Sequence, residues 1–265
     1  MLYFVATPIG NLQDMSFRAV ETLKSVDEIA CEDTRHSLGL LSHFDIKKPL
    51  FSYHKFNEKE VGEKIIEKLK SGKNIAVISD AGMPVVSDPG NVLVKMLIEN
   101  GLEYTVVPGA SAFVSALVLS GLDSAKFCFL GFLPQKKGDR KEFLQKYLDL
   151  DATLIFYSAP HDLKDDVQSI YEVFGDRNAV AVKEITKLHE KVERFTLKAG
   201  VNFEPKGEFV LLVEGGKKEN LKLQLSEKEH IESYLKEGLD KKEALKRVAK
   251  ERGVSKSSLY KYTIE

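Results

Sequence analysis

Short apolar runs alternate with helical stretches through the first half of the chain, and this alternation constrains the fold more than any other feature. Four runs have the length and composition of buried strands, at 2–6, 28–31, 74–79 and 104–107. Helical stretches follow them at 16–24, 58–70, 91–100 and 111–121. Such alternation favours a mainly parallel sheet, with the functional loops at the carboxyl ends of its strands.

The second half has more strands and fewer helices. Strand-like segments occur at 153–157, 179–184, 192–196 and 208–214, with one clear helix at 162–174. This pattern predicts an α+β domain with a mixed sheet. We therefore divide the chain into an N-terminal α/β domain at 1–121, a second domain at 122–220 and a tail at 221–265.

The tail, 221–265, is rich in Lys, Glu and Leu. Ser226 and Glu229 form a capping box that opens a helix. A second helix is expected at 240–252, and Ser255 caps a third that runs to Tyr262. This arrangement resembles a helix-turn-helix and predicts an RNA-binding tail, although such motifs also serve purely structural ends.

Composition narrows the class of protein. The chain has 265 residues, 43% hydrophobic and 30% charged, with a formal net charge of -1, so RNA contacts must come from local patches. Its two cysteines lie outside any CxxC, the start lacks signal-peptide features, and no apolar run approaches a membrane span. We expect a cytoplasmic protein without a membrane segment, and the scattered histidines predict no metal site.

The segment 79–90, SDAGMPVVSDPG, is the strongest local signal. It follows a buried strand and holds two Asp, two Pro and two Gly in twelve residues. It lacks the GxGxxG cradle and the Walker lysine, so the expected ligand carries no pyrophosphate. A cation such as a sulfonium or an α-ammonium suits its carboxylates. The alternative is a surface turn with capping Asp residues.

Two further loops follow strands of the first half. Pro8 to Asn11 places a glycine where backbone can approach a ligand, although a plain turn fits as well. Residues 108–112 open a helix whose free N–H groups could hold a carboxylate, with simple capping by Ser111 as the alternative.

Three charged segments could carry catalysis or RNA contacts. They are 32–36 (EDTRH), 184–190 (EITKLHE) and 132–141 (FLPQKKGDRK). Taken alone, each is equally well explained as a solvated charged loop.

The ordered set of motifs resembles one family. TPIGNL, EDTRHS, ISDAGMPVVSDPG, PGASA, GFLPQKKGDR, LIFYSAPHDL, EITKLHE and GEFVLLVEG precede the terminal helices. This order is similar to the 16S ribosomal RNA (cytidine-2′-O)-methyltransferases, in the tetrapyrrole-methylase-like class. The resemblance covers essentially the whole chain.

The resemblance implies two α/β domains of tetrapyrrole methylase type with the cofactor between them, plus the small helical tail, in a homodimer. The implied donor is S-adenosyl-L-methionine, and the acceptor is a cytidine ribose 2′-hydroxyl in the decoding region of 16S rRNA, within the small ribosomal subunit. The chain departs from the family pattern at Met83, Ala110 and Asp162.

Site residues are predicted from these loops. The cofactor residues are expected to be Pro8, Gly10, Asp80, Ala81, Gly82, Pro84, Val85, Gly109, Ser111 and Ala112. The catalytic candidates are Lys187, Glu184, Asp33 and Glu190, with Lys187 favoured as a base because burial readily shifts a lysine pKa. The RNA-binding candidates are Arg35, Lys136, Lys137, Arg140 and Lys141.

Two other functions compete with RNA methylation. A tetrapyrrole methyltransferase would share fold and cofactor, but a small macrocycle needs neither the basic segment at 132–141 nor the terminal helices. A non-catalytic nucleic-acid-binding regulator would use the tail and merely sense a ligand.

Overall fold

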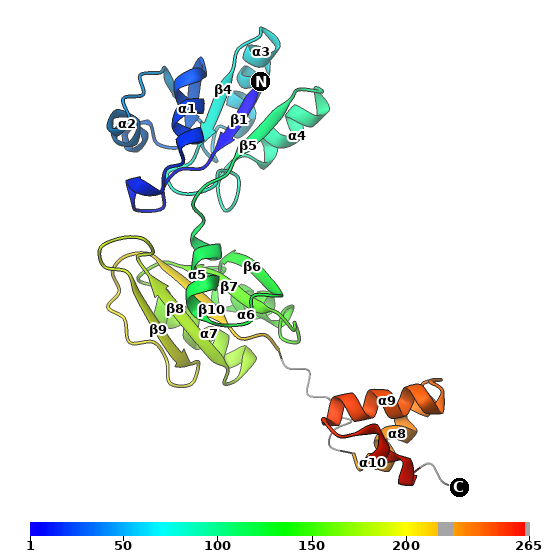
Figure 1. Cartoon of the computed structure of the whole chain (residues 1–265). Coiled ribbons are helices and arrows are strands. Elements are labelled where there is room, and N and C mark those ends of the chain that lie inside the picture. The colour runs from blue at the N-terminus through cyan, green and yellow to red at the C-terminus, as the bar shows by residue number, and fades with distance from the viewer. Residues whose placement is uncertain (217–224, 263–265) are drawn as a thin grey trace. The chain divides into compact units, whose positions relative to one another are not determined.

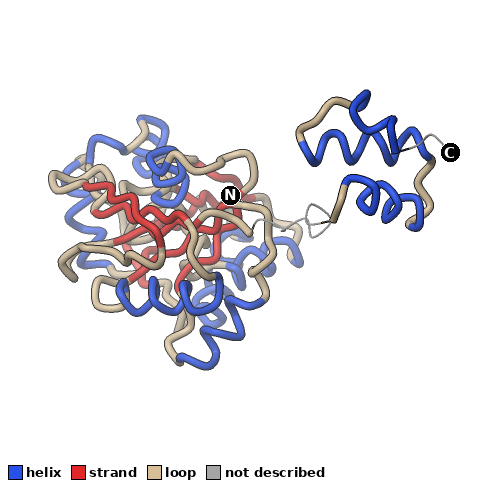
Figure 2. Tube along the Cα trace, turned by 90° about the horizontal axis from the view of Figure 1, so that it is seen from below, coloured by secondary structure: helices blue, strands red, loops and turns tan. Residues whose placement is uncertain are grey.

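The computed structural model describes residues 1–216 and 225–262, and the chain divides into two compact units, Met1–Gly216 and Lys217–Glu265. The first unit has two lobes, each built on a five-stranded sheet (Figure 1). Figure 2 shows the strands of this unit in its interior with helices on the outside. The predicted fold class, two α/β layers followed by a helical segment, is confirmed.

The first lobe contains an all-parallel sheet. Its strands, in the spatial order β3-β2-β4-β1-β5, are β1 (Leu2–Val5), β2 (Glu28–Cys31), β3 (Leu50–Ser52), β4 (Ile75–Ile78) and β5 (Tyr104–Val107). The helices are η1 (Leu12–Asp14), α1 (Phe17–Ser25), α2 (Thr34–His43), α3 (Glu58–Lys70) and α4 (Asn91–Glu99). All four residues of β4 are buried, as expected for a parallel sheet covered on both faces.

The second lobe contains a mixed sheet, as the sequence predicted. Its strands, in the order β6-β7-β10-β8-β9, are β6 (Phe127–Phe132), β7 (Thr153–Ser158), β8 (Asn178–Lys183), β9 (Lys191–Thr196) and β10 (Phe209–Val213). β6 pairs in parallel with β7, and the other neighbours are antiparallel. Helices α5 (Ala112–Ser120), α6 (Lys137–Gln145) and α7 (Leu163–Phe174) pack with this lobe.

Helix α5 belongs to the second lobe, although the boundary drawn at residue 121 assigned it to the first. Ala116 and Leu117 are buried in a cluster with residues of β7, β8 and β10. The helix is apolar on nearly every side, so its sequence does not indicate which sheet it covers. The chain therefore crosses between the lobes just after β5. The predicted start of the tail, residue 221, lies outside the described residues.

Five elements were missing from the sequence interpretation: η1, β3, β6, α2 and α6. The segment 32–36 was expected to be a loop, but α2 begins at Thr34 because the Asp33 carboxylate accepts the Arg35 N–H at 2.8 Å. The basic segment 132–141 was also expected to be a loop, and from Lys137 it is the helix α6.

The position of Arg140 on α6 contradicts its predicted contact with RNA. Its side chain is 8% exposed and pairs with buried Asp166 of α7 at 3.2 Å. Arg140 Nε also donates to the Pro134 carbonyl at 3.0 Å, and Asp166 accepts from the Ser158 hydroxyl at 2.6 Å. Arg140 therefore fixes α6 against α7 and the end of β7, because a buried cation needs a partner of this kind.

The C-terminal unit is a small helical bundle, in the arrangement that the sequence predicted. It contains α8 (Glu227–Lys236), α9 (Lys241–Arg252), α10 (Lys256–Leu259) and η3 (Tyr260–Tyr262). The capping box of Ser226 and Glu229 is present. Ile231, Leu245, Val248 and Leu259 form its apolar core. Among the described residues, no helix of the chain has the length and apolar character of a membrane span.

Candidate active site

The loops that follow β1 and β4 are held together by backbone hydrogen bonds. The Thr7 N–H donates to the Gly82 carbonyl at 2.9 Å, and the Gly82 N–H donates to the Thr7 carbonyl at 3.2 Å. The Thr7 hydroxyl also donates to the Ser79 carbonyl at 3.2 Å. Because β1 and β4 are adjacent parallel strands, their loops emerge at the same edge of the sheet.

The loop after β5 joins them there by a close approach. A Cβ atom at Gly109 would lie 2.9 Å from the Ala6 Cβ, so only glycine lets this loop pass the end of β1. Ser111 then occupies the N-cap of α5, and its side chain makes no capping hydrogen bond. The first N–H groups of α5 therefore remain available as donors at this edge.

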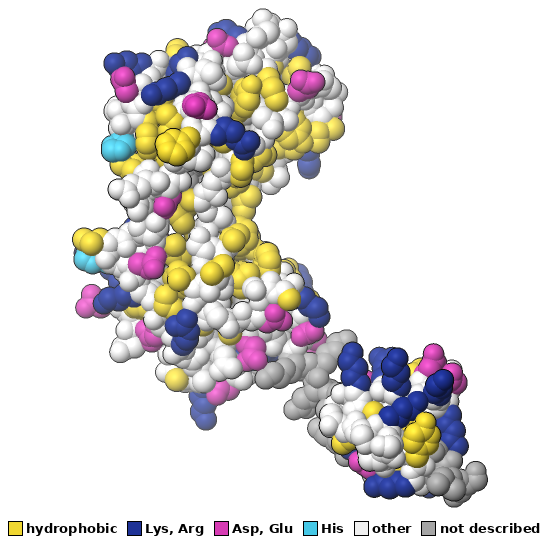
Figure 3. All heavy atoms as spheres, viewed as in Figure 1, with side chains coloured by type: hydrophobic (Ala, Val, Ile, Leu, Met, Phe, Trp, Pro, Cys, Tyr) yellow, Lys and Arg dark blue, Asp and Glu magenta, His cyan; other side chains and the backbone are white. Residues whose placement is uncertain are grey.

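A cavity of about 420 Å³ lies where these loops meet the second sheet. Its size is typical of a small-molecule site. Its wall contains mostly apolar side chains and three carboxylates. The lining residues are Ile9, Asp80, Ala81, Gly82, Met83, Val86, Ser87, Asp88, Ser111, Ala112, Phe113, Phe132, Tyr157, Ser158, Ala159, Pro160, Val182, Ile185, Glu208, Phe209 and Val210. On the face drawn in Figure 3, hydrophobic side chains gather where the two lobes meet.

The loop from Asp80 to Gly90 holds a strained backbone. Val85 and Ser87 have φ angles of 77° and 67°, in the left-handed region that non-glycine residues rarely adopt. Gly90 has a φ of 142°, and a Cβ there would lie 2.5 Å from Val85 Cγ2. Strain of this kind persists where surrounding structure fixes it, and it concentrates at ligand-binding loops.

Several carboxylates lie close together at this loop. No basic side chain is among the groups that shift the pKa of Asp88. Burial raises the pKa of Asp88 to about 6, and the negative charges of Glu32 and Asp80 raise it further, against a hydrogen bond from Ser79. Burial and Asp80 likewise raise the pKa of Glu32. Ionised carboxylates held this close cost free energy, which a bound cation would recover.

Lys187 lies beside the cavity between two glutamates. Its Nζ donates to Glu208 at 2.7 Å and to Glu184 at 3.1 Å. Burial lowers the pKa of the ammonium, but these two hydrogen bonds outweigh it, so the net pKa is raised. A raised pKa keeps Lys187 protonated at neutral pH. This contradicts the lowered pKa on which its prediction as a general base depended.

Glu184 is held ionised by the same group of residues. Burial raises the pKa of Glu184, whereas the hydrogen bonds from the Glu208 N–H and Lys187 lower it, and the net shift is downward. The Glu184 Oε1 accepts that N–H at 2.8 Å. Gly207 has a φ of 94°, and a Cβ there would meet the Glu184 side chain at 2.8 Å. Glu184 and Lys187 thus form a fixed salt bridge, and of the three residues Glu184, Lys187 and Glu208 only Glu208 lines the cavity.

The loop after β8 is also tied to the first lobe. A Cβ at Gly10 would lie 2.4 Å from Lys187 Cγ, so the glycine makes room for the lysine stem. The Thr186 hydroxyl donates to Asp14 at 2.5 Å. The predicted loops TPIGN and EITKLHE, which are far apart in sequence, therefore lie in contact.

The remaining predicted catalytic residues do not line the cavity. The carboxylate of Asp33 caps α2, and hydrogen bonds from the Arg35 side chain and N–H lower its pKa to about 2. Glu190 accepts the Thr186 N–H at 2.7 Å and holds its own loop. Of the predicted RNA-binding residues, Arg35, Lys136, Lys137 and Lys141 are exposed, so that prediction stays open for them.

Half of the predicted cofactor residues line the cavity: Asp80, Ala81, Gly82, Ser111 and Ala112. Pro8, Gly10, Pro84, Val85 and Gly109 shape the same loops without lining it. The structure adds Asp88, Tyr157 and Glu208. Asp88 lies in the SDPG motif, Tyr157 at a strand end and Glu208 in the motif GEFVLLVEG, but none of the three was selected as a site residue. Among the described residues, no group of His, Cys, Asp or Glu is arranged to hold a metal ion.

Comparison with known proteins agrees with this geometry. The family model Tetrapyrrole (Corrin/Porphyrin) Methylases matches residues 1–199. Among solved structures, diphthine synthase superposes with a TM-score of 0.61 at 16% identity, covering 80% of this chain and 89% of that one. Uroporphyrin-III C-methyl transferase from Thermus thermophilus, complexed with S-adenyl homocysteine, superposes with a TM-score of 0.56 at 17% sequence identity. The match covers 80% of this chain and 96% of that one. Fold and cavity thus define a methylase of the tetrapyrrole class.

Relatives in sequence narrow the class. The ribosomal RNA small subunit methyltransferase I of Halalkalibacterium halodurans is 46% identical over 98% of this chain and 93% of the relative. The ribosomal RNA small subunit methyltransferase I of Bacillus subtilis is 44% identical over 98% of this chain and 92% of the relative. The chain belongs to the ribosomal RNA small subunit methyltransferase I family. This membership confirms the predicted cofactor, S-adenosyl-L-methionine, whose demethylated form is S-adenosyl homocysteine.

The raised pKa of Asp88 yields a prediction on stability. A carboxyl whose pKa is raised to about 6 from 3.8 stabilises the fold when protonated, and this contribution is lost as pH rises through about 6. We expect Asp88→Asn to raise the free energy of unfolding at pH 8, and this gain to shrink by about 1 kcal/mol at pH 5. Denaturant unfolding at both pH values measures it. Exposed Asp165→Asn is the control, and an Asp88→Asn gain independent of pH would contradict the prediction.

Proposed function

We propose that the chain transfers a methyl group from S-adenosylmethionine to the ribose 2′-hydroxyl of a cytidine in the decoding region of 16S rRNA. The observation that carries the proposal is the cavity between the lobes, which combines Asp80 and Asp88 with the amino end of α5 above apolar side chains. The full-length similarity to ribosomal RNA small subunit methyltransferases supports RNA as the acceptor.

The residues present fit the cofactor. Asp80 and Asp88 would hold its cationic sulfonium and ammonium groups, because clustered carboxylates gain from a cation. The N–H groups at the start of α5 would hold its carboxylate. Ile9, Phe113 and Val210 give apolar contacts for an adenine ring. The cofactor supplies an electrophilic methyl group on sulfur.

Residues of the chain then have to position the hydroxyl and accept its proton. Methyl transfer needs the ribose oxygen in line with the methyl–sulfur bond, which is a problem of orientation. The raised pKa of Lys187 disfavours it as a proton acceptor at neutral pH, so we propose that it acts as a cation that holds Glu208 in place at the cavity wall. We propose Glu208 as the proton acceptor, because it is the one cavity carboxylate that is not assigned to the cationic groups of the cofactor.

The two rival functions receive less support. The tetrapyrrole methyltransferases among the solved structures share the fold at under 20% identity, whereas the ribosomal RNA methyltransferases are 40–46% identical over nearly the whole chain. A non-catalytic regulator does not need a strained loop and a cavity with crowded carboxylates.

We also propose a homodimer that acts in the cytoplasm on the small ribosomal subunit. β5 is an edge strand, and its Tyr104 and Val106 are exposed, as are Val114 and Val118 one turn apart on α5. A second copy of the chain would cover these apolar side chains and the open strand edge. A monomeric mass in sedimentation analysis would contradict the dimer.

The direct test supplies tritiated S-adenosylmethionine and small ribosomal subunits from cells that lack the endogenous enzyme. Label on a cytidine ribose in the decoding region, located by nuclease digestion and mass spectrometry, is the expected result. Label elsewhere on the RNA would overturn the assigned position. Cofactor binding without any label would favour the small-molecule rival.

Lys187 provides a test of its role as a cation. We expect Lys187→Ala to lower kcat/KM for methylation roughly 10- to 100-fold and Lys187→Arg to stay within about 10-fold of the unaltered enzyme, because arginine keeps the charge. A general base at this position would lose about 100-fold or more in both variants, since a guanidinium stays protonated. Exposed Lys198→Ala is the matched control.

A further inference from the structure

The C-terminal unit differs in charge from the rest of the chain. Residues 225–262 contain ten Lys and Arg against seven Asp and Glu, whereas residues 1–216 contain 26 against 31. In Figure 3 the C-terminal unit presents several Lys and Arg side chains on the face in view. The neutral average of the chain therefore conceals a basic unit at its end.

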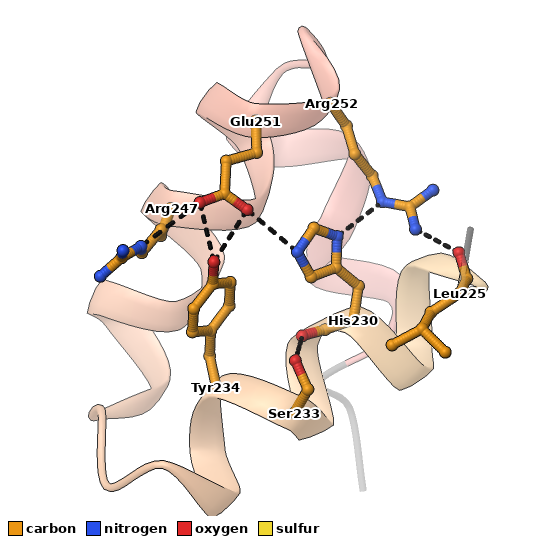
Figure 4. Close-up of polar contacts among 7 residues, drawn as sticks. All are labelled: Leu225, His230, Ser233, Tyr234, Arg247, Glu251 and Arg252. Carbon is orange, nitrogen blue, oxygen red and sulfur yellow. Dashed lines mark hydrogen bonds and ion pairs between the residues drawn. The ribbon is translucent and has the colours of Figure 1, made fainter. Parts of the chain in front are cut away.

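Most carboxylates of this unit are engaged inside it. Glu251 accepts from the Tyr234 hydroxyl at 2.8 Å, His230 Nε2 at 3.0 Å and Arg247 Nε at 3.3 Å (Figure 4). His230 is fully buried, and its Nδ1 accepts from Arg252 Nε at 3.1 Å. Glu251 therefore pairs with Arg247, whereas Arg252 donates to His230 and to the Leu225 carbonyl.

Three of the other six acids cap helices or pair with a lysine near the end of the chain. Glu229 closes the capping box of α8, Asp240 caps α9 and Glu227 lies 3.6 Å from Lys261. These carboxylates compensate helix dipoles and a single lysine. None of these three carboxylates pairs with a lysine of α9.

Three lysines of α9 form one basic stripe, which is Lys242, Lys246 and Lys250. They are exposed and four residues apart, so they lie on the same face with a rise of about 6 Å between neighbours. Within residues 225–262 no carboxylate forms an ion pair with any of them. The opposite face of α9, with Leu245 and Val248, is buried against the core of the unit.

The third helix is less suited to nucleic acid than a helix-turn-helix would suggest. α10 has only four residues, about one turn, whereas recognition usually uses a longer helix laid in a groove. Its lysine, Lys256, lies over the Tyr260 ring at 5.9 Å, and Lys261 of η3 contacts the Tyr262 ring and Glu227.

We infer that the basic stripe on α9, and not α10, is the surface through which the C-terminal unit binds RNA phosphates. Repeated point charges without base-reading side chains favour contacts to the backbone. A membrane surface fits less well, because the apolar face of α9 is buried. The inference rests on the proposed function, since it takes RNA as the substrate.

The test compares two triple variants of the full chain with equal net charge. The stripe variant carries Lys242→Gln, Lys246→Gln and Lys250→Gln. The control variant carries Lys228→Gln, Lys236→Gln and Lys256→Gln, which are lysines of α8 and α10. Binding to an RNA fragment spanning the decoding region is titrated from 50 to 300 mM salt, and cofactor binding and thermal unfolding are measured on both.

We expect the stripe variant to lose about tenfold or more in RNA affinity. The slope of the logarithm of the binding constant against the logarithm of the salt concentration should become shallower by about 2 to 3. The control variant should lose less than about threefold. Both should bind the cofactor and unfold as the unaltered chain does, because five of the six substituted lysines are exposed and Lys256 is only half-buried.

Equal losses in the two variants would overturn the inference, because net charge alone would explain them. A larger loss in the control variant would place the RNA contact on α8 or α10 and overturn it as well. Failure of the proposed function would appear differently, as an unaltered chain that binds the cofactor but methylates no small subunit.

Discussion

The pair of backbone hydrogen bonds between Thr7 and Gly82 is the interaction on which the rest of the site depends. It joins the loops after two parallel strands, and the close approach of Gly109 to Ala6 adds the loop after a third. Because main-chain atoms make these connections, the side chains of Asp80, Asp88 and Ser111 remain free to line the cavity. The second lobe completes the wall through Tyr157 and Glu208.

The parallel sheet, the mixed sheet and the terminal helices could be predicted from the sequence, because each depends on local periodicity or helix capping. Sequence reasoning also selected the loops after β1, β4 and β5, parts of which line the cavity, although simple turns would equally have explained their Gly and Pro residues. The position of Glu208 at the cavity could not be predicted, because it depends on the pairing of strands that are distant in sequence. Arg140 was misassigned because a cation in a short basic segment looks solvated until its partner, Asp166 on another helix, is known.

The pKa of Lys187 is a second property that could not be predicted from the sequence. The charged neighbourhood of Lys187 was visible in EITKLHE, but the direction of its pKa shift depends on the balance between burial and two carboxylates. One of those carboxylates, Glu208, lies 21 residues away in the chain. The selection of Lys187 as a functional residue stays a prediction, and the raised pKa disfavours the role of general base that the sequence suggested.

The crowded carboxylates around Asp88 have a consequence for turnover. In the proposed site they face a sulfonium before the reaction and a neutral thioether after it, so the attraction to the sulfur is lost with the transferred methyl group while that to the ammonium group remains. The same cluster that destabilises the empty fold would then favour exchange of spent for fresh cofactor. Product release would be built into the electrostatics of one loop, without the need for a large conformational change.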